Sequence, residues 1–96
     1  MAPTSTTIGI VATSARLSKP EAAAVASLGM LGFARALSPP HTAFDGDTLF
    51  VLSTGDVPGD VTALGLAAAD AVAAAIVNGI RAATSLPHLP AARDLA

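Results

Sequence analysis

The sequence contains two short apolar runs typical of strands, and each is followed by a long segment rich in alanine and other small residues. β-Branched and apolar residues dominate Thr7 to Thr13 and again Thr48 to Thr54, which predicts a strand at each place. The predicted order is therefore β-α-β-α, an α/β (α+β) arrangement. Because two strands cannot cover two helices and also both of their own faces, we expect part of a layered sandwich whose other strands come from elsewhere.

The first predicted helix has clear start and stop signals. Ser18-Lys19-Pro20-Glu21 fits a capping box, in which the Ser18 hydroxyl accepts from the Glu21 N–H and the Glu21 carboxylate accepts from the Ser18 N–H. The pattern predicts a continuous helix to about Leu37, and Pro39-Pro40 then stops it.

The second predicted helix begins after a loop. Residues 55–59 combine glycine, aspartate and proline, which is typical of a loop. Asp60 is a favourable N-cap for a helix to about Ala83, and we expect most of that helix surface to be covered. Residues 84–96 are expected to form an irregular tail.

The composition suggests that the core is completed by another polypeptide. The hydrophobic fraction is 52%, but much of it is alanine, and Phe33, Phe44 and Phe50 are the only aromatic residues. The strand from Thr7 to Thr13 is apolar on both faces, which predicts burial on both sides. The length of 96 residues allows one domain, residues 1–96.

Charge and residue types exclude several classes of function. The net charge is −2 with only five lysines and arginines, so we expect no nucleic-acid partner. The chain has no cysteine, which excludes disulfides and thiolate chemistry. His41 and His88 lie far apart without ligand-spaced neighbours, so we expect no metal and no cofactor.

The same considerations predict a cytoplasmic chain. No basic region followed by an apolar run begins the sequence, so no signal peptide is expected. Leu64 to Ile80 is long and apolar, but Asp70 lies in its middle and alanine is weakly lipophilic. We therefore expect no membrane partner.

Thr6 is a candidate nucleophile at the start of the first strand. A threonine hydroxyl is a poor nucleophile at neutral pH and needs a base beside it, which a free α-amine on the same residue can supply. Such an amine has an ordinary pKa of about 7.7–8.0, so part of it is neutral near physiological pH. The residues alone leave the alternative that Thr6 merely caps the strand.

Asp45 and Asp47 are candidate acidic partners. Two carboxylates separated by Gly46 can hold an ammonium or a general base, and each can raise the pKa of the other. The alternative is that Asp45-Gly46 is simply a turn. The other oxygen ligands of a calcium loop are missing.

Three motifs, taken in order, resemble the C-terminal (β) subunit of the DmpA-like L-aminopeptidase/D-esterase peptidases, and most of all their nylon-oligomer hydrolase branch. The similarity runs from Ser5 to the tail and covers nearly all of this chain, but only the last third or so of a family precursor. The motifs are Ser5-Thr6-Thr7-Ile8-Gly9-Ile10-Val11-Ala12-Thr13, His41-Thr42-Ala43-Phe44-Asp45-Gly46-Asp47-Thr48-Leu49-Phe50 and Ser53-Thr54-Gly55.

The resemblance implies a self-processing hydrolase of the N-terminal-nucleophile type. Thr6 would be the nucleophile, and Asp45 and Asp47 would match the two assisting acids. The implied fold is a four-layer αββα sandwich shared with an α subunit, assembled into (αβ)n oligomers that act on small peptides or other amides and esters. Residues 1–5 would be a pre-nucleophile segment that must be removed, and residues 6–96 the β-subunit-like part.

Two departures from the family pattern leave other functions open. Ser5 stands where the Thr-type members commonly have Asn, and Met1 to Ser5 stand in place of a whole α subunit. The alternatives are a non-catalytic truncated fragment, or a small-molecule-binding or structural subunit.

Overall fold

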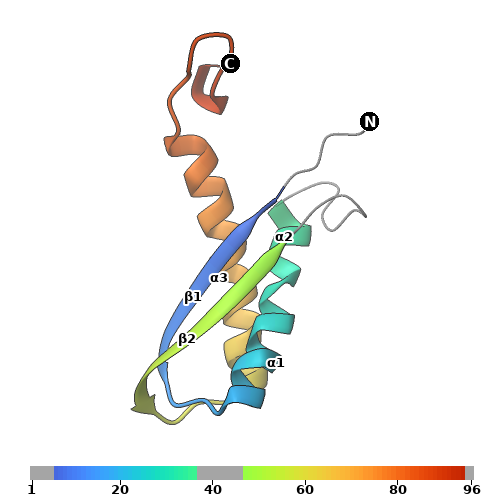
Figure 1. The fold of residues 1–96 in the computed structure, drawn as a ribbon, viewed down its shortest axis with the longest axis vertical. Coiled ribbons are helices and arrows are strands. Elements are labelled where there is room, and N and C mark those ends of the chain that lie inside the picture. Colours follow the sequence, from blue (N-terminus) through green and yellow to red (C-terminus); the bar gives the residue numbers. More distant parts are fainter. Residues whose placement is uncertain (1–5, 37–46, 95–96) are drawn as a thin grey trace.

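The computed structural model describes residues 6–36 and 47–94, and the predicted β-α-β-α order is confirmed there (Figure 1). The first predicted helix is divided into two, and a short 3-10 helix follows the last long one. The elements are β1 Ile8–Ala15, α1 Lys19–Gly29, α2 Leu31–Ala36, β2 Thr48–Val57, α3 Val61–Ala82 and η1 Ala92–Asp94.

The two strands form a parallel sheet, and the helices lie on one side of it (Figure 1). The register pairs Ile8 with Thr48 and continues to Thr13 with Ser53 before it shifts. Because parallel strands begin at the same end of a sheet, Thr7 before β1 and Asp47 before β2 lie side by side.

β2 is longer than predicted, because it continues through the expected loop at residues 55–59 as far as Val57. The backbones come very close where the register shifts. A Cβ built on Gly55 would lie 2.7 Å from the carbonyl oxygen of Ser14, so only glycine permits this approach. The glycines and proline of residues 55–59 therefore permit an irregular strand pairing as well as a turn.

The expectation of one continuous helix to about Leu37 is wrong, because the helix breaks at Met30. The Phe33 N–H donates to the Met30 carbonyl at 3.0 Å, which is the tighter spacing of a 3-10 turn. Glycines on either side of the break allow close packing there. A Cβ on Gly29 would meet Leu49 at 2.7 Å, and one on Gly32 would meet the Ala69 carbonyl oxygen at 2.5 Å. Both halves thus pack closely against α3, and α1 also packs against β2.

The core is small and lies between the sheet and the helices. Phe33, Leu49 and Val72 form a buried cluster, and Phe33 is only 1% exposed. Val11, Met30 and Ile76 pack around this cluster and are partly buried. Gly9 leaves room for Leu49, whose Cδ1 would lie 3.0 Å from a Cβ at that position.

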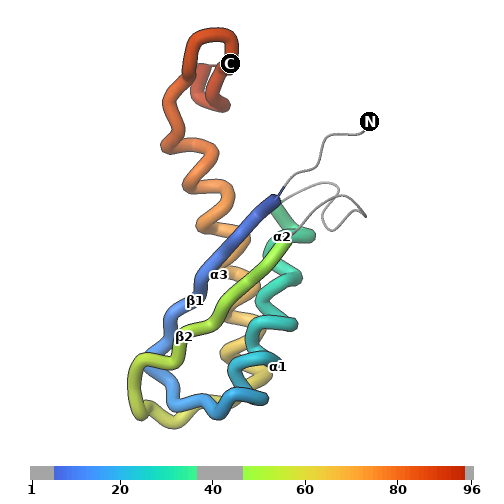
Figure 2. Tube along the Cα trace, in the orientation of Figure 1, coloured from blue at the N-terminus to red at the C-terminus, as the bar shows by residue number. Residues whose placement is uncertain are grey.

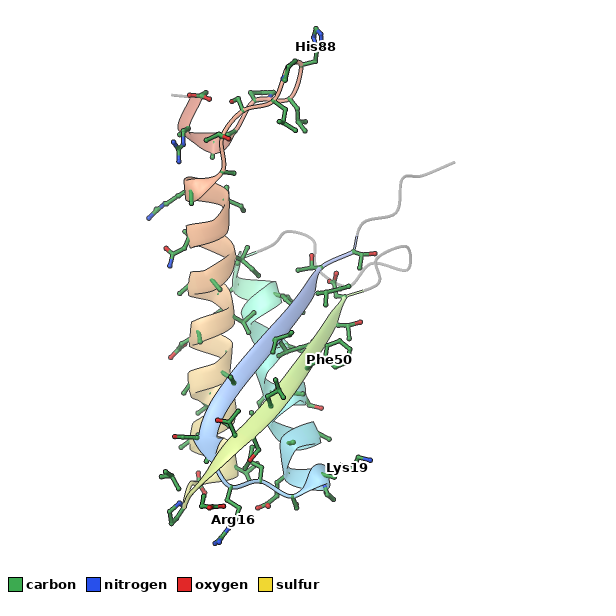
Figure 3. The ribbon with its side chains drawn as sticks, turned by 60° about the vertical axis from the view of Figure 1, so that its left-hand side comes forward. Arg16, Lys19, Phe50 and His88 are labelled. Atoms are coloured by element: carbon green, nitrogen blue, oxygen red, sulfur yellow. The ribbon has the colours of Figure 1, made fainter. Side chains whose placement is uncertain are left out.

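The expectation that β1 is buried on both faces is wrong within this chain. Ile8 and Ile10 are each 67% exposed, and in the register they lie beside Thr48 and Phe50. Phe50, labelled in Figure 3, is itself 57% exposed. Side chains alternate along a strand, and the helices of this chain cover only one of the two faces. The other face is largely apolar, and the described part of the chain leaves it open.

The expectation that α3 is mostly covered is also wrong. Its buried residues are Gly65, Ala68, Ala69 and Val72, whereas residues 77–82 are all exposed. The end of the helix extends beyond the sheet (Figure 2). By length and composition alone α3 is apolar enough to cross a membrane, with a mean hydropathy of 1.8. In this fold its first half packs instead against α1 and α2.

Both predicted helix starts are confirmed. The Asp60 carboxylate accepts from the Ala63 N–H at 2.8 Å at the start of α3. At the start of α1 the Ser18 N–H donates to the Glu21 carboxylate at 2.8 Å, and the Glu21 N–H donates to the Ser18 hydroxyl at 3.3 Å. The hydrogen bond from the Ser18 N–H lowers the pKa of Glu21, because it favours the charged carboxylate.

We expect the capping box to weaken in acid. A carboxyl group whose pKa is lowered by folding contributes stability above its unfolded pKa, and this is lost as pH falls through the folded pKa. For Glu21 that window lies below the ordinary value of 4.5. Amide exchange of Ser18, followed by NMR against pH, should therefore speed up there beyond its intrinsic pH dependence. Glu21→Gln keeps an acceptor but does not titrate, so it should remove this effect, and an unchanged acid response in the variant would contradict the assignment.

Candidate active site

Asp47 lies against Thr7, the residue that follows Thr6, at the end of the sheet where both strands begin. The backbone N–H of Thr7 donates to Oδ1 of Asp47 at 3.2 Å, although the two residues are 40 positions apart. The Thr48 N–H donates to the Thr7 carbonyl at 2.9 Å, which continues the parallel pairing up to this point. The parallel register therefore places the carboxylate beside the peptide group that joins Thr6 to Thr7.

The two described candidates differ in their exposure. Thr6 is exposed, and Asp47 is half-buried. The hydrogen bond from the Thr7 N–H fixes the position of the Asp47 carboxylate. Asp45, the third candidate from the sequence, lies outside the described residues. The site as described therefore consists of an accessible threonine followed by a peptide N–H that is bound to an aspartate.

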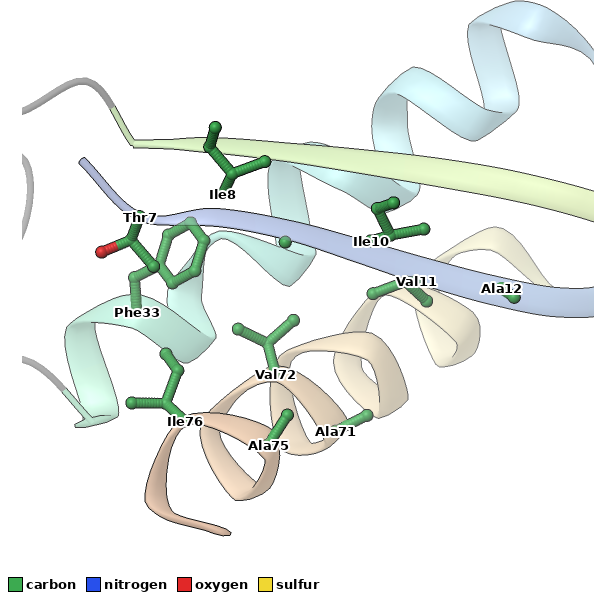
Figure 4. Close-up of a pocket in the computed structure, with 11 residues that line it drawn as sticks. Thr7, Ile8, Ile10, Val11, Ala12, Phe33, Ala71, Val72, Ala75 and Ile76 are labelled. Atoms are coloured by element: carbon green, nitrogen blue, oxygen red, sulfur yellow. The ribbon is translucent and has the colours of Figure 1, made fainter. Parts of the chain in front are cut away.

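A cavity of about 350 Å³ begins next to this site and was not predicted from the sequence (Figure 4). We call it the edge groove, because it runs along the edge of β1 that faces away from β2. Among its lining residues only Thr7 has a polar side chain. The lining residues are Thr7 to Ala12 of β1, Phe33 of α2, and Ala71, Val72, Ala75 and Ile76 of α3.

The sequence contained only a weak signal for the edge groove. Ala71 and Ala75 are four residues apart on α3, so they share one face of that helix, and both are exposed. An alanine pair in an alanine-rich helix is not distinctive by itself. Only the fold shows that this small-residue face lies beside the open edge of β1.

We expect Asp47→Ala to loosen the start of β1. The variant leaves the half-buried Thr7 N–H without its carboxylate acceptor, which costs about 0.5–1.5 kcal/mol in the free energy of unfolding. Exchange of the Thr7 amide should accelerate, which NMR measures directly. Asp47→Asn retains an oxygen acceptor without the charge and should protect that amide nearly as well. Equal exchange rates in the wild type and the alanine variant would show that the contact has no influence on the strand.

Comparison with known proteins identifies the chain as a peptidase sequence. The sequence model described as Peptidase family S58 matches residues 2–91, which is nearly the whole chain. The chain therefore belongs to peptidase family S58. This confirms the peptidase class that the resemblance of the motifs implied.

The curated relatives are longer proteins named as aminopeptidases. A Mycobacterium leprae protein, named an uncharacterized aminopeptidase, is 42% identical over 100 residues, which cover 88% of this chain and 28% of the relative. A Mycobacterium bovis protein with the same description is 38% identical over 108 residues, covering 97% of this chain and 31% of the relative. The chain thus spans less than a third of the length of these relatives. No solved structure matches it.

Proposed function

We propose that the chain is the β subunit of a self-processing aminopeptidase or amide hydrolase in which Thr6 is the nucleophile. The observation that best supports this is the contact between the Asp47 carboxylate and the Thr7 N–H. The nitrogen of Thr6 is separated from that of Thr7 only by Cα and the carbonyl carbon. An α-amine freed at Thr6 would therefore lie close to a carboxylate that is already held in place.

In the proposed mechanism, cleavage of the Ser5–Thr6 peptide bond frees the Thr6 amine. The amine takes the proton from Oγ as Oγ attacks the carbonyl carbon of an amide or ester substrate. The carbon–nitrogen or carbon–oxygen bond then breaks, and the leaving amine or alcohol departs with that proton. Water, deprotonated by the same amine, attacks the acyl-threonine ester, which releases the acid and restores Oγ–H.

Asp47, assisted by Asp45, would orient the amine and stabilise its protonated form between these steps. A carboxylate near an ammonium group lowers the free energy of the charged pair. The donors that stabilise the developing oxyanion would be backbone N–H groups or groups of the α subunit. We further propose an (αβ)n assembly in the cytoplasm, active on small peptides or other amides, without nucleic acid, membrane, metal or cofactor. Membership of the nylon-oligomer hydrolase branch is part of the same proposal.

Co-expression with the part of the Mycobacterium leprae relative that this chain does not match tests the function. Intact mass spectrometry should show that the chain has lost residues 1–5 and begins at Thr6. The purified complex should release the amine from a panel of aminoacyl and β-aminoacyl amides and esters. A complex that is fully processed but inactive on the whole panel would favour the alternative of a binding or structural subunit. Turnover by a chain that retains residues 1–5 would contradict the need for a free amine.

A further inference from the structure

We propose that the open edge of β1 pairs with a strand from the part of the family-length polypeptide that lies outside this chain, and that this strand occupies the edge groove. The inference rests on the two-part enzyme proposed above, and it assigns the place where the two parts join. It applies to residues 8–12 of β1 and to the face of α3 that carries Ala71 and Ala75.

The backbone of β1 has hydrogen-bonding groups directed to this edge. Alternate residues of a parallel strand direct their N–H and C=O groups to the partner strand, and the residues between them direct theirs to the opposite side. Because the Thr7 carbonyl accepts from Thr48, the odd-numbered residues face β2. Ile8, Ile10 and Ala12 therefore direct their N–H and C=O groups to the edge groove. Among the described residues the sheet has two strands, so no third strand uses these groups.

The edge groove has room for the side chains of an added strand. Its wall on α3 consists partly of the exposed alanines Ala71 and Ala75 (Figure 4). Because these side chains are small, they leave space between the helix and the strand. Phe33 and Val72 contribute to its apolar lining. The wall along β1 is the continuous stretch Thr7 to Ala12, about 20 Å long at the rise of a strand. A strand with apolar residues on alternate positions fits this shape and this lack of charge.

The length of the relatives indicates which polypeptide supplies the strand. This chain matches 28% and 31% of two proteins in which the matched region and the remainder belong to one polypeptide. Parallel sheets in proteins have both faces covered and rarely stop at two strands. More than two thirds of each relative is available to extend the sheet, and a second copy of this chain is not required. We therefore assign the strand to that remainder.

The assignment is tested with a chimera. In this chimera the 96-residue chain replaces the matched segment of the Mycobacterium leprae relative. Hydrogen exchange is read residue by residue along β1. Gly9 and Val11, which face β2, serve as the internal reference for a folded sheet. We expect the amides of Ile8, Ile10 and Ala12 to be protected like the reference, by about 100-fold or more over the free peptide rate. Fast exchange at these three amides beside a protected reference would overturn the proposal.

Paired tryptophan variants on α3 supply a second measurement. Ala74 and Ala75 are adjacent exposed alanines of one helix, but only Ala75 lines the edge groove. Ala75→Trp should fill the groove, lower the melting temperature of the chimera by several degrees and remove the protection of Ile10. Ala74→Trp should change neither. Equal effects of the two variants would overturn the proposal.

The remaining outcomes separate this inference from the proposed function. Protection that disappears on dilution would assign the groove to a second copy and overturn the proposal. If the chimera does not protect Gly9 and Val11, the same amides are compared after mixing the chain with the separately expressed remainder of the relative. Protection of Ile8, Ile10 and Ala12 without hydrolysis of any amide supports the pairing and contradicts the function. Hydrolysis that depends on Thr6, without protection of these three amides, supports the function and contradicts the pairing.

Discussion

Thr6→Ala should abolish both self-cleavage before residue 6 and hydrolysis of amide substrates by the assembled enzyme. The substitution removes the only atom that the proposed mechanism uses to form the acyl-enzyme, and loss of such a nucleophile costs at least about a thousand-fold in turnover. Intact mass should show that residues 1–5 are retained. Steady-state assays on the complex should show no activity above background.

Two controls distinguish a catalytic role of Thr6 from a structural one. Thr6→Ser keeps a hydroxyl and should retain processing and measurable turnover. Thr7→Ser changes the neighbouring residue, whose N–H binds Asp47, and should leave both reactions in place because the backbone donor remains. Normal hydrolysis by Thr6→Ala would remove Thr6 from the mechanism, even if the complex assembles correctly.

Gly32→Ala should destabilise the fold strongly, although alanine is the better helix former. The new Cβ would lie 2.5 Å from the carbonyl oxygen of Ala69 and 2.7 Å from Cβ of Val72. The first of these is a backbone atom within α3, so it cannot move aside as a flexible side chain would. We expect the free energy of unfolding to fall by about 1–3 kcal/mol, as it does when a packed core is overfilled. Urea denaturation of the full chain, with and without its partner, measures the change.

Gly79→Ala is the matched control, because it makes the same chemical change in a helix of the same fold. A Cβ at Gly79 meets no atom within 4 Å, so only the backbone preference remains. This variant should be more stable than the wild type by about 0.5–1 kcal/mol. If the two variants behaved alike, close packing between α2 and α3 would not be the reason for glycine at position 32.

Local features of this fold were predictable because they depend on neighbours in the chain. The Ser18–Glu21 capping box and the Asp60 N-cap each involve residues three positions apart, and both are confirmed. The break at Met30 was not predicted, and it lies between Gly29 and Gly32, whose close contacts with β2 and α3 are tertiary. A helical pattern of apolar residues continues across such a break and does not reveal it.

The candidate site also has a part that the sequence predicted and a part that only the fold shows. Thr6, Asp45 and Asp47 were recognised from residue types and motif order, without knowledge of the fold. The contact between Asp47 and the Thr7 N–H depends on the parallel register of β1 and β2, which no local pattern specifies. The edge groove depends on where α3 lies relative to β1, and an alanine-rich helix offers several similar faces to choose from.

The sequence by itself determined the order of the elements and the starts of the two long helical segments, and it supplied the candidate residues for the proposed amide chemistry. Only the tertiary structure decided that residues 6–36 and 47–94 leave one face and one edge of the sheet open, and that Asp47 lies beside the residue following Thr6. The physical reason is that caps and strand patterns arise from interactions within a few residues. Exposure, register and grooves arise from contacts between segments about 40 residues apart, such as Thr7 and Asp47.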